Sequence, residues 1–164
     1  MDTIFKKVND LKSIIKERIL SNQKLLKMIV YNEENPFDLP DIDDPQSLLN
    51  NYIYLNPVVW DTTIQEVRTF VLTNFRVAPN RVNTAFADVY LYFYVISHND
   101  IYALENGDTR VISICDELMK SFDSSYGNWV GKCDLNSFQE ITSRKDYYAI
   151  ELQFKFSDFK GEIR

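Results

Sequence analysis

Two runs of residues with a hydrophobic period of two constrain the fold of this chain more than any other feature. In the first run, residues 65–77, one predicted face holds Val67, Thr69, Val71, Thr73, Phe75 and Val77. In the second run, residues 84–97, one face holds Ala87, Val89, Leu91, Phe93 and Val95, and the other holds Asp88, Tyr90, Tyr92, Tyr94 and Ile96. Because successive side chains of a strand point to opposite faces, the two runs predict a long antiparallel pair of strands.

The rest of the C-terminal region predicts a helix and then a second pair of strands. A turn and helix N-cap at residues 106–108 precede a one-sided apolar pattern that ends near Ser121. A weaker alternating run at residues 129–141 and a stronger one at 147–156 are separated by a polar turn at 143–146. The predicted fold class is therefore α+β: an N-terminal helix, then strand–strand–helix–strand–strand, with an antiparallel sheet packed by helices.

The first part of the chain has a different pattern. In residues 3–20, apolar side chains recur at steps of three and four residues, which predicts an amphipathic helix. Residues 21–30 predict a second short helix or a bent continuation of the first. Between residues 32 and 57, four prolines each push the preceding residue out of the helical region. We expect residues 32–56 to be extended and loop-like, with a short helical turn at 46–51.

Charge divides the chain in the same way. The 164 residues carry a net charge of −6, with +4 in residues 1–30 and −7 in residues 31–64. We expect a single domain, residues 1–164, that comprises a helical arm (1–30), an acidic proline-rich segment (31–64) and an α+β body (65–164). We also expect the acidic segment to dock on a basic neighbour and to become ordered only on binding. Its interface candidates are Glu33, Glu34, Asp38, Asp41, Asp43 and Asp44.

An aromatic stripe on the second strand supplies another set of candidates. Tyr90, Tyr92 and Tyr94, together with Phe86, share one predicted strand face. Such stripes stack on single-stranded nucleic acid when a basic groove accompanies them, but this face carries Asp88 and the whole chain is acidic. Tyrosine is also favoured where it buries area and keeps a polar tip. We therefore expect Tyr90, Tyr92 and Tyr94 to be buried, either within the fold or between chains.

Candidate catalytic and metal-binding motifs fail on spacing and composition. His98 is the single histidine, so we interpret it as an ordinary residue at the end of a strand. Residues 127–132 are one position short of a phosphate-binding loop, and Cys133 stands where that loop needs a hydroxyl group. The aspartates of residues 38–44 lack the central glycine and closing glutamate of a calcium-binding loop, which favours a solvated acidic loop.

These exclusions argue against an enzyme. We predict no catalytic residues, no cofactor and no metal site. Cys115 and Cys133 are expected to be small buried hydrophobic side chains, as in a reducing compartment. The longest apolar run, residues 89–96, is far shorter than the roughly 20 residues of a membrane helix, and no apolar signal core is visible. We expect the chain to be made and kept in the cytoplasm, without a membrane partner.

The order of predicted elements resembles that of the tail-terminator (tail-completion) proteins of long-tailed bacteriophages. The resemblance rests on residues 65–77, 88–98, 108–122 and 146–154, and residues 19–28 with the acidic loop also look like phage neck proteins. It implies a structural virion protein, assembled in the host cytoplasm into a homo-oligomeric ring, usually a hexamer. Such a ring caps the tail tube and joins it to the head connector or stopper proteins, and double-stranded DNA passes through its lumen without specific binding.

Three alternatives remain open at this point. A small acidic cytoplasmic protein, from a phage or a bacterium, that binds and inhibits one host protein would have a similar composition. Another adaptor layer of the neck or connector would share the resemblance, and the length of the acidic segment leaves room for that position. An enzyme would need a polar cluster around His98, Asp100 and Asp88.

Overall fold

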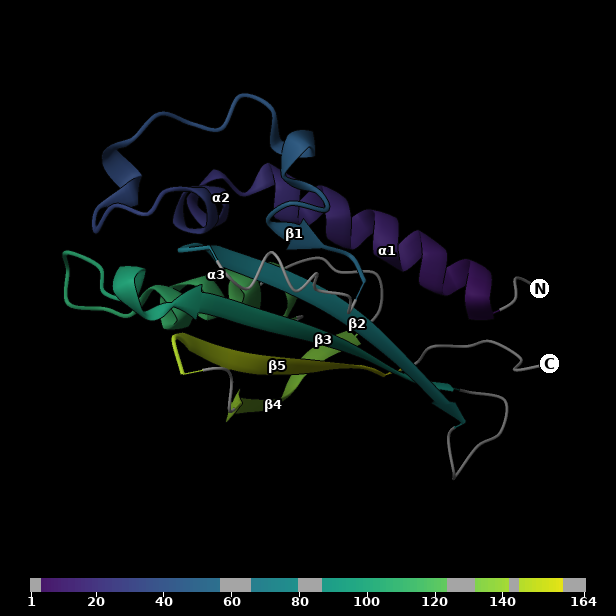
Figure 1. Ribbon diagram of the computed structural model, residues 1–164. Coiled ribbons are helices and arrows are strands. Elements are labelled where there is room, and N and C mark those ends of the chain that lie inside the picture. Colours follow the sequence, from purple (N-terminus) through teal and green to yellow (C-terminus); the bar gives the residue numbers. More distant parts are fainter. Residues whose placement is uncertain (1–3, 57–65, 80–86, 124–131, 142–144, 158–164) are drawn as a thin grey trace.

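Five strands form one mixed sheet in the computed structural model of the chain, which describes residues 4–56, 66–79, 87–123, 132–141 and 145–157 (Figure 1). The strand order across the sheet is β1-β2-β3-β5-β4. The short strand β1 runs parallel to β2, and the other neighbours pair antiparallel. The strands are β1 (Ile53–Tyr54), β2 (Thr69–Pro79), β3 (Ala87–His98), β4 (Lys132–Ile141) and β5 (Tyr147–Ser157).

The long antiparallel pair predicted from the alternating runs is confirmed. β2 and β3 pair without a break from Thr69 opposite Ser97 to Pro79 opposite Ala87. Along β3 the side chains alternate strictly between buried and half-buried, as two faces of a strand predict. The buried face is that of Val89 and Phe93, and the face of Tyr90, Tyr92 and Tyr94 is half-buried. Residues 66–68 precede the strand, so β2 begins later than expected, and residues 65 and 84–86 lie outside the described part of the chain.

Three α-helices pack on one face of this sheet: α1 (Ile4–Ser21), α2 (Gln23–Val30) and α3 (Arg110–Phe122). The predicted second short helix is α2, and the side chain of Asn22 caps it by accepting a hydrogen bond from the backbone N–H of Leu25 at 3.0 Å. The turn before α3 is also confirmed, with Gly107 at a φ of 83°. The residue at the N-cap of α3, however, is Thr109, and not a residue of the turn as the sequence indicated.

The main core lies between the helices and the inward side chains of the sheet. α2 packs beside α3, and α3 packs across β3 and β5. Phe93 of β3 is fully buried, with its ring centroid 4.9 Å from that of Phe122 and 5.9 Å from that of Phe154. Burial of three aromatic rings at one point stabilises the contact between α3 and the sheet through their large apolar area.

The acidic segment differs from the expectation of a chain that orders only on binding. Its described part, residues 31–56, contains two 3-10 turns, η1 (Pro36–Asp38) and η2 (Pro45–Leu48), and the strand β1. The side chain of Gln23 binds the backbone of Ile42 twice, donating to its carbonyl at 3.1 Å and accepting from its N–H at 2.8 Å. Residues 31–56 therefore have defined contacts with the helices. The expected helical turn at 46–51 is η2, which begins one residue earlier, at Pro45, and already ends at Leu48.

Candidate functional site

The sheet face opposite the helices carries the predicted tyrosine stripe at its centre. Strand register aligns the side chains of this face in three rows that run across the sheet. We call the surface that these rows form the tyrosine face. The rows are Arg76–Tyr90–Lys155–Asp134, Asn74–Tyr92–Gln153–Ser137 and Leu72–Tyr94–Glu151–Gln139.

Hydrogen bonds fix the middle row of the tyrosine face. The amide of Gln153 donates to the hydroxyl of Tyr92 at 2.6 Å, while its Oε1 accepts from the hydroxyl of Ser137 at 2.9 Å and from Asn136 at 2.7 Å. The rings of Tyr92 and Tyr94 are stacked, with centroids 6.4 Å apart and planes 9° apart. The stripe is thus held in one arrangement before any partner arrives, which lowers the entropy lost on binding.

The outer rows carry charges of opposite sign on β5. In one row, the Nζ of Lys155 lies 5.7 Å from the ring centroid of Tyr90 and 3.5 Å from the carboxylate of Asp88. In the other, Glu151 accepts a hydrogen bond from Gln139 at 3.0 Å. Burial and the negative charge of Glu151 both raise the pKa of Tyr94. Arg76, in the row of Lys155, is exposed.

A second, smaller hydrophobic core lies at one end of the tyrosine face. It consists of Tyr54, Phe70, Leu72 and Tyr147, with Tyr94 and Ile96 packed against it. The hydroxyl of Tyr147 donates to the backbone carbonyl of Glu66 at 2.6 Å. The three tyrosines of β3 are half-buried within the single chain, and therefore keep part of their surface available. Phe86, the fourth member of the predicted stripe, lies outside the described residues.

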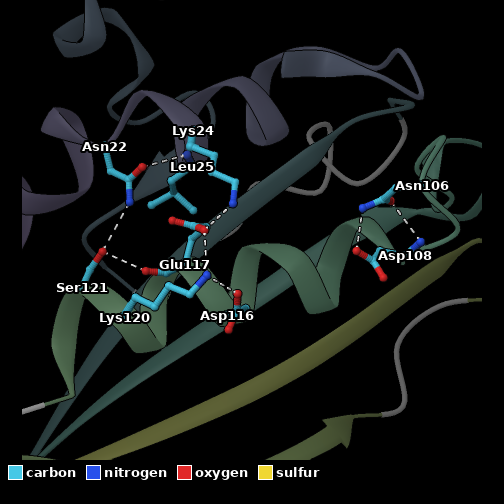
Figure 2. Close-up of polar contacts among 9 residues, drawn as sticks. All are labelled: Asn22, Lys24, Leu25, Asn106, Asp108, Asp116, Glu117, Lys120 and Ser121. Atoms are coloured by element: carbon cyan, nitrogen blue, oxygen red, sulfur yellow. Dashed lines mark hydrogen bonds and ion pairs between the residues drawn. The ribbon is translucent and has the colours of Figure 1, made fainter. Parts of the chain in front are cut away.

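A polar cluster lies on the opposite side of the molecule, between α2 and α3 (Figure 2). Glu117 accepts hydrogen bonds from Lys24 at 2.7 Å and from Lys120 at 3.2 Å, and Lys120 also pairs with Asp116 at 2.6 Å. Burial disfavours the charged form of Glu117, but the two lysine hydrogen bonds and their positive charges outweigh it and leave the pKa below its usual value. The spacing of Asp116 and Lys120 is visible in the sequence, whereas the partnership with Lys24 is not.

Next to this cluster is an open hollow of about 450 Å³ lined by Arg18, Ser21, Asn22, Gln23, Lys120 and Ser121. Arg18 donates to the backbone carbonyl of Ser121 at 2.7 Å, and Lys120 pairs with the carboxylates of Asp116 and Glu117. Both cations of the hollow thus have partners that stabilise the end of α3. The tyrosine face is therefore the stronger candidate for a functional surface.

Comparison with known families assigns this chain to one of them. The model of the YomW family matches residues 22–156. The chain belongs to the YomW family. This family is phage-derived, of the SPbeta-like prophage type. No curated protein and no solved structure matches the chain.

The region shared with the YomW family contains the whole tyrosine face. The match begins at the N-cap of α2 and ends in β5, so α2, α3 and the strands that carry the three rows all lie within it. The residues that build the candidate surface therefore all lie within the region that matches the family model.

His98 has a structural role in the YomW-family chain. Its Nδ1 accepts a hydrogen bond from the backbone N–H of Asp100 at 3.2 Å and so caps the short turn η4 (Asn99–Ile101). Its ring lies edge-on to Tyr147, with centroids 5.0 Å apart. Asp88 lies at the other end of β3, so the structure does not bring it together with His98 and Asp100. The cluster that an enzyme would need at these three residues is therefore not formed.

The acidic candidates occupy a different surface from the tyrosine face. Asp41 forms an ion pair with Lys27 of α2 at 2.8 Å, and Asp38 accepts a hydrogen bond from Asn35 at 2.9 Å. All six acidic side chains are exposed: Glu33, Glu34, Asp38, Asp41, Asp43 and Asp44. The two sets of interface candidates thus stay separate, with the acidic set on the helix-covered side, where η1 packs against α2.

Both cysteines are buried free thiols, as predicted. Burial raises the pKa of Cys115 and of Cys133 to about 12, so neither supplies a thiolate at neutral pH. Among the described residues, no group of three or more His, Cys, Asp or Glu side chains could hold a metal ion. In the same part of the chain, no helix has the length and apolar character needed to cross a membrane. The glycine-rich stretch 127–131 lies outside the described residues.

Proposed function

We propose that this YomW-family protein is a structural protein of the phage neck, a tail terminator. In this role it forms a ring, with six subunits, that caps the tail tube and joins it to the connector or stopper proteins of the head. Two facts support the proposal. The family is phage-derived, and the body has the strand–strand–helix–strand–strand order on which the resemblance to tail terminators rests.

The observation that carries the proposal is the tyrosine face. Protein interfaces are enriched in tyrosine and arginine, and this face presents three half-buried tyrosines with Arg76 beside them. Its polar groups bind one another across three strands, through Tyr92 of β3, Gln153 of β5 and Ser137 of β4, and are not gathered around a reactive side chain. Such a pre-ordered surface suits a protein that assembles with other proteins.

One edge of the sheet supports the ring itself. β4 is the last strand of the sheet in the described part of the chain, and Phe138 on it is 49% exposed. An edge strand has backbone N–H and C=O groups that can pair with a neighbouring subunit, and a head-to-tail contact of this kind closes into a ring. Acidic subunits around the lumen would repel phosphates, so that double-stranded DNA passes without specific binding.

Deletion of the gene from its phage tests the role. A tail terminator stops polymerisation of the tail tube, so the mutant should produce tails of uncontrolled length, and electron microscopy of wild-type virions should place the protein at the head end of the tail. Tails of normal length that fail to join heads would identify another layer of the neck. Normal virions, with the protein recovered in a stable one-to-one complex with a host protein, would overturn the proposal in favour of a host inhibitor.

A further inference from the structure

We infer that the tyrosine faces of two copies of this protein pack against each other about a two-fold axis parallel to the strands, between β3 and β5. The inference goes beyond the proposed function, because it concerns a contact between two copies that holds whether or not the protein occupies the neck. It follows from the order of side chains within each row of the tyrosine face.

The first row is complementary to itself when its direction is reversed. It reads Arg76, Tyr90, Lys155, Asp134 from β2 to β4. A two-fold axis between β3 and β5 places Arg76 over the second copy's Asp134 and Lys155 over the second copy's Tyr90. Each contact occurs twice, which gives two arginine–carboxylate pairs at the outside and two cation–π contacts nearer the axis.

The middle row behaves in the same way, and so does the centre of the third row, whereas Leu72 at the end of the third row is buried in the smaller core of its own chain. In the middle row, Tyr92 meets the second copy's Gln153, and Asn74 meets the second copy's Ser137; all four side chains donate and accept hydrogen bonds. In the third row, Tyr94 meets the second copy's Glu151. The phenol O–H of Tyr94 is able to donate a hydrogen bond to that carboxylate.

The geometry of sheets agrees with this axis. Two sheets that pack face to face keep their strands within about 30° of each other, as a two-fold axis parallel to the strands requires. Four strands at about 4.8 Å spacing and three rows make a patch on the order of 400 Å² for each copy. This is below a standard interface, so the expected dimer is weak and forms at high local concentration, such as that of an assembling particle.

A charge swap tests the inference, because Arg76 and Asp134 do not meet within one chain. They lie on the outer long strands, three strand spacings or about 14 Å apart. Sedimentation velocity over a concentration series should show a weak dimer for the wild-type chain. Arg76→Asp and Asp134→Arg should each weaken the dimer at least tenfold, and the double variant should recover most of the lost affinity.

Matched controls separate this result from a general effect of charge. Asp43→Arg makes the same charge change as Asp134→Arg on the exposed acidic segment and should leave the dimer unchanged. If Asp134→Arg does not fold, Asp134→Asn replaces it and should still weaken the dimer. Single variants that associate like the wild type, or a double variant no better than either single, would overturn the inference. A two-fold axis across the strands would instead place Lys155 over the second copy's Glu151. Recovery of dimer affinity in a variant that exchanges Lys155 and Glu151, with none in the variant that exchanges Arg76 and Asp134, would therefore overturn the proposed axis in favour of that one.

These outcomes are independent of the proposed function. If the double variant recovers the dimer affinity that each single variant loses, while the deletion mutant makes normal tails, the dimer is supported and the neck role is overturned. If the deletion mutant makes tails of uncontrolled length, while the double variant recovers no dimer affinity, the neck role is supported and the dimer is overturned.

Discussion

The guanidinium of Arg110, at the start of α3, donates a hydrogen bond to the backbone carbonyl of Glu33 at 2.6 Å, across 77 positions of sequence. The same side chain donates to the carbonyls of Met28, Tyr31 and Ile101 at 2.6–2.8 Å, and it is fully buried. Met28 and Tyr31 lie at the end of α2, where helix carbonyls have no partner within the helix. Arg110 thus ends α2 and fixes the start of the acidic segment.

Substitution of Arg110 should therefore destabilise the whole fold. We expect Arg110→Met to lower the free energy of unfolding by about 3 to 5 kcal/mol, because it leaves buried carbonyls without donors. Arg110→Lys keeps the charge but cannot reach four carbonyls from one planar group, so it should recover only part of that loss. Urea unfolding followed by circular dichroism measures both. A loss below 1 kcal/mol for Arg110→Met would show that these hydrogen bonds of Arg110 do not stabilise the fold.

The contact between Gln23 and Ile42 should order the middle of the acidic segment. Gln23→Ala removes two hydrogen bonds and is expected to cost about 1 to 2 kcal/mol. Hydrogen exchange should become faster around residues 38–44 while exchange in β3 and β5 hardly changes. Gln23→Glu retains only the acceptor and should give an intermediate result. Equal exchange at residues 38–44 in the wild type and in Gln23→Ala would show that this contact does not order the segment.

Glu117 should make the stability of the fold sensitive to acid. Its pKa is lowered in the folded state, so its carboxylate contributes stability above the unfolded-state pKa of about 4.3, and this contribution is lost as the pH falls through the folded-state pKa. Glu117→Gln should cost about 1 kcal/mol at pH 7 and flatten the decline of stability below pH 4.5. Asp116→Asn, which touches only Lys120, is the control and should have a smaller effect. Urea titrations between pH 3 and pH 7 measure the difference.

The two cysteines should be inert in the native protein. With a pKa of about 12 and little exposure, Cys115 and Cys133 should react with a thiol reagent such as Ellman's at pH 8 only as fast as the fold opens. Both should react at once in denaturant. In Cys115→Ser, Cys133 is the one remaining thiol, so this variant assigns each reaction rate to one of the two cysteines. Rapid reaction of either thiol in the native protein would contradict its burial.

Local patterns in the sequence predicted much of the fold. The alternation along β3 assigned Phe93 and Tyr92 to opposite faces, because the direction of a strand side chain depends only on its position in the strand. The structure decided that the face of Phe93 is the core. The same reasoning from local patterns gave α1, α2, α3 and the candidates Tyr90, Tyr92 and Tyr94. It missed β1, whose two residues follow a proline-rich segment and pair with β2 only through tertiary contact.

By itself, then, the sequence determined most of the helices and strands, which side chains share a face of each strand, and which catalytic motifs are excluded. The tertiary structure decided the rest. It inserted β5 between β3 and β4, which brought Arg76, Tyr90, Lys155 and Asp134 into one row, and it placed Arg110 against the end of α2. The physical reason is that the alternation of side chains along a strand, and their recurrence along a helix, depend only on neighbouring residues in the sequence. Strand order, register between distant strands and the partners of a buried cation depend on how the helices and the sheet pack together.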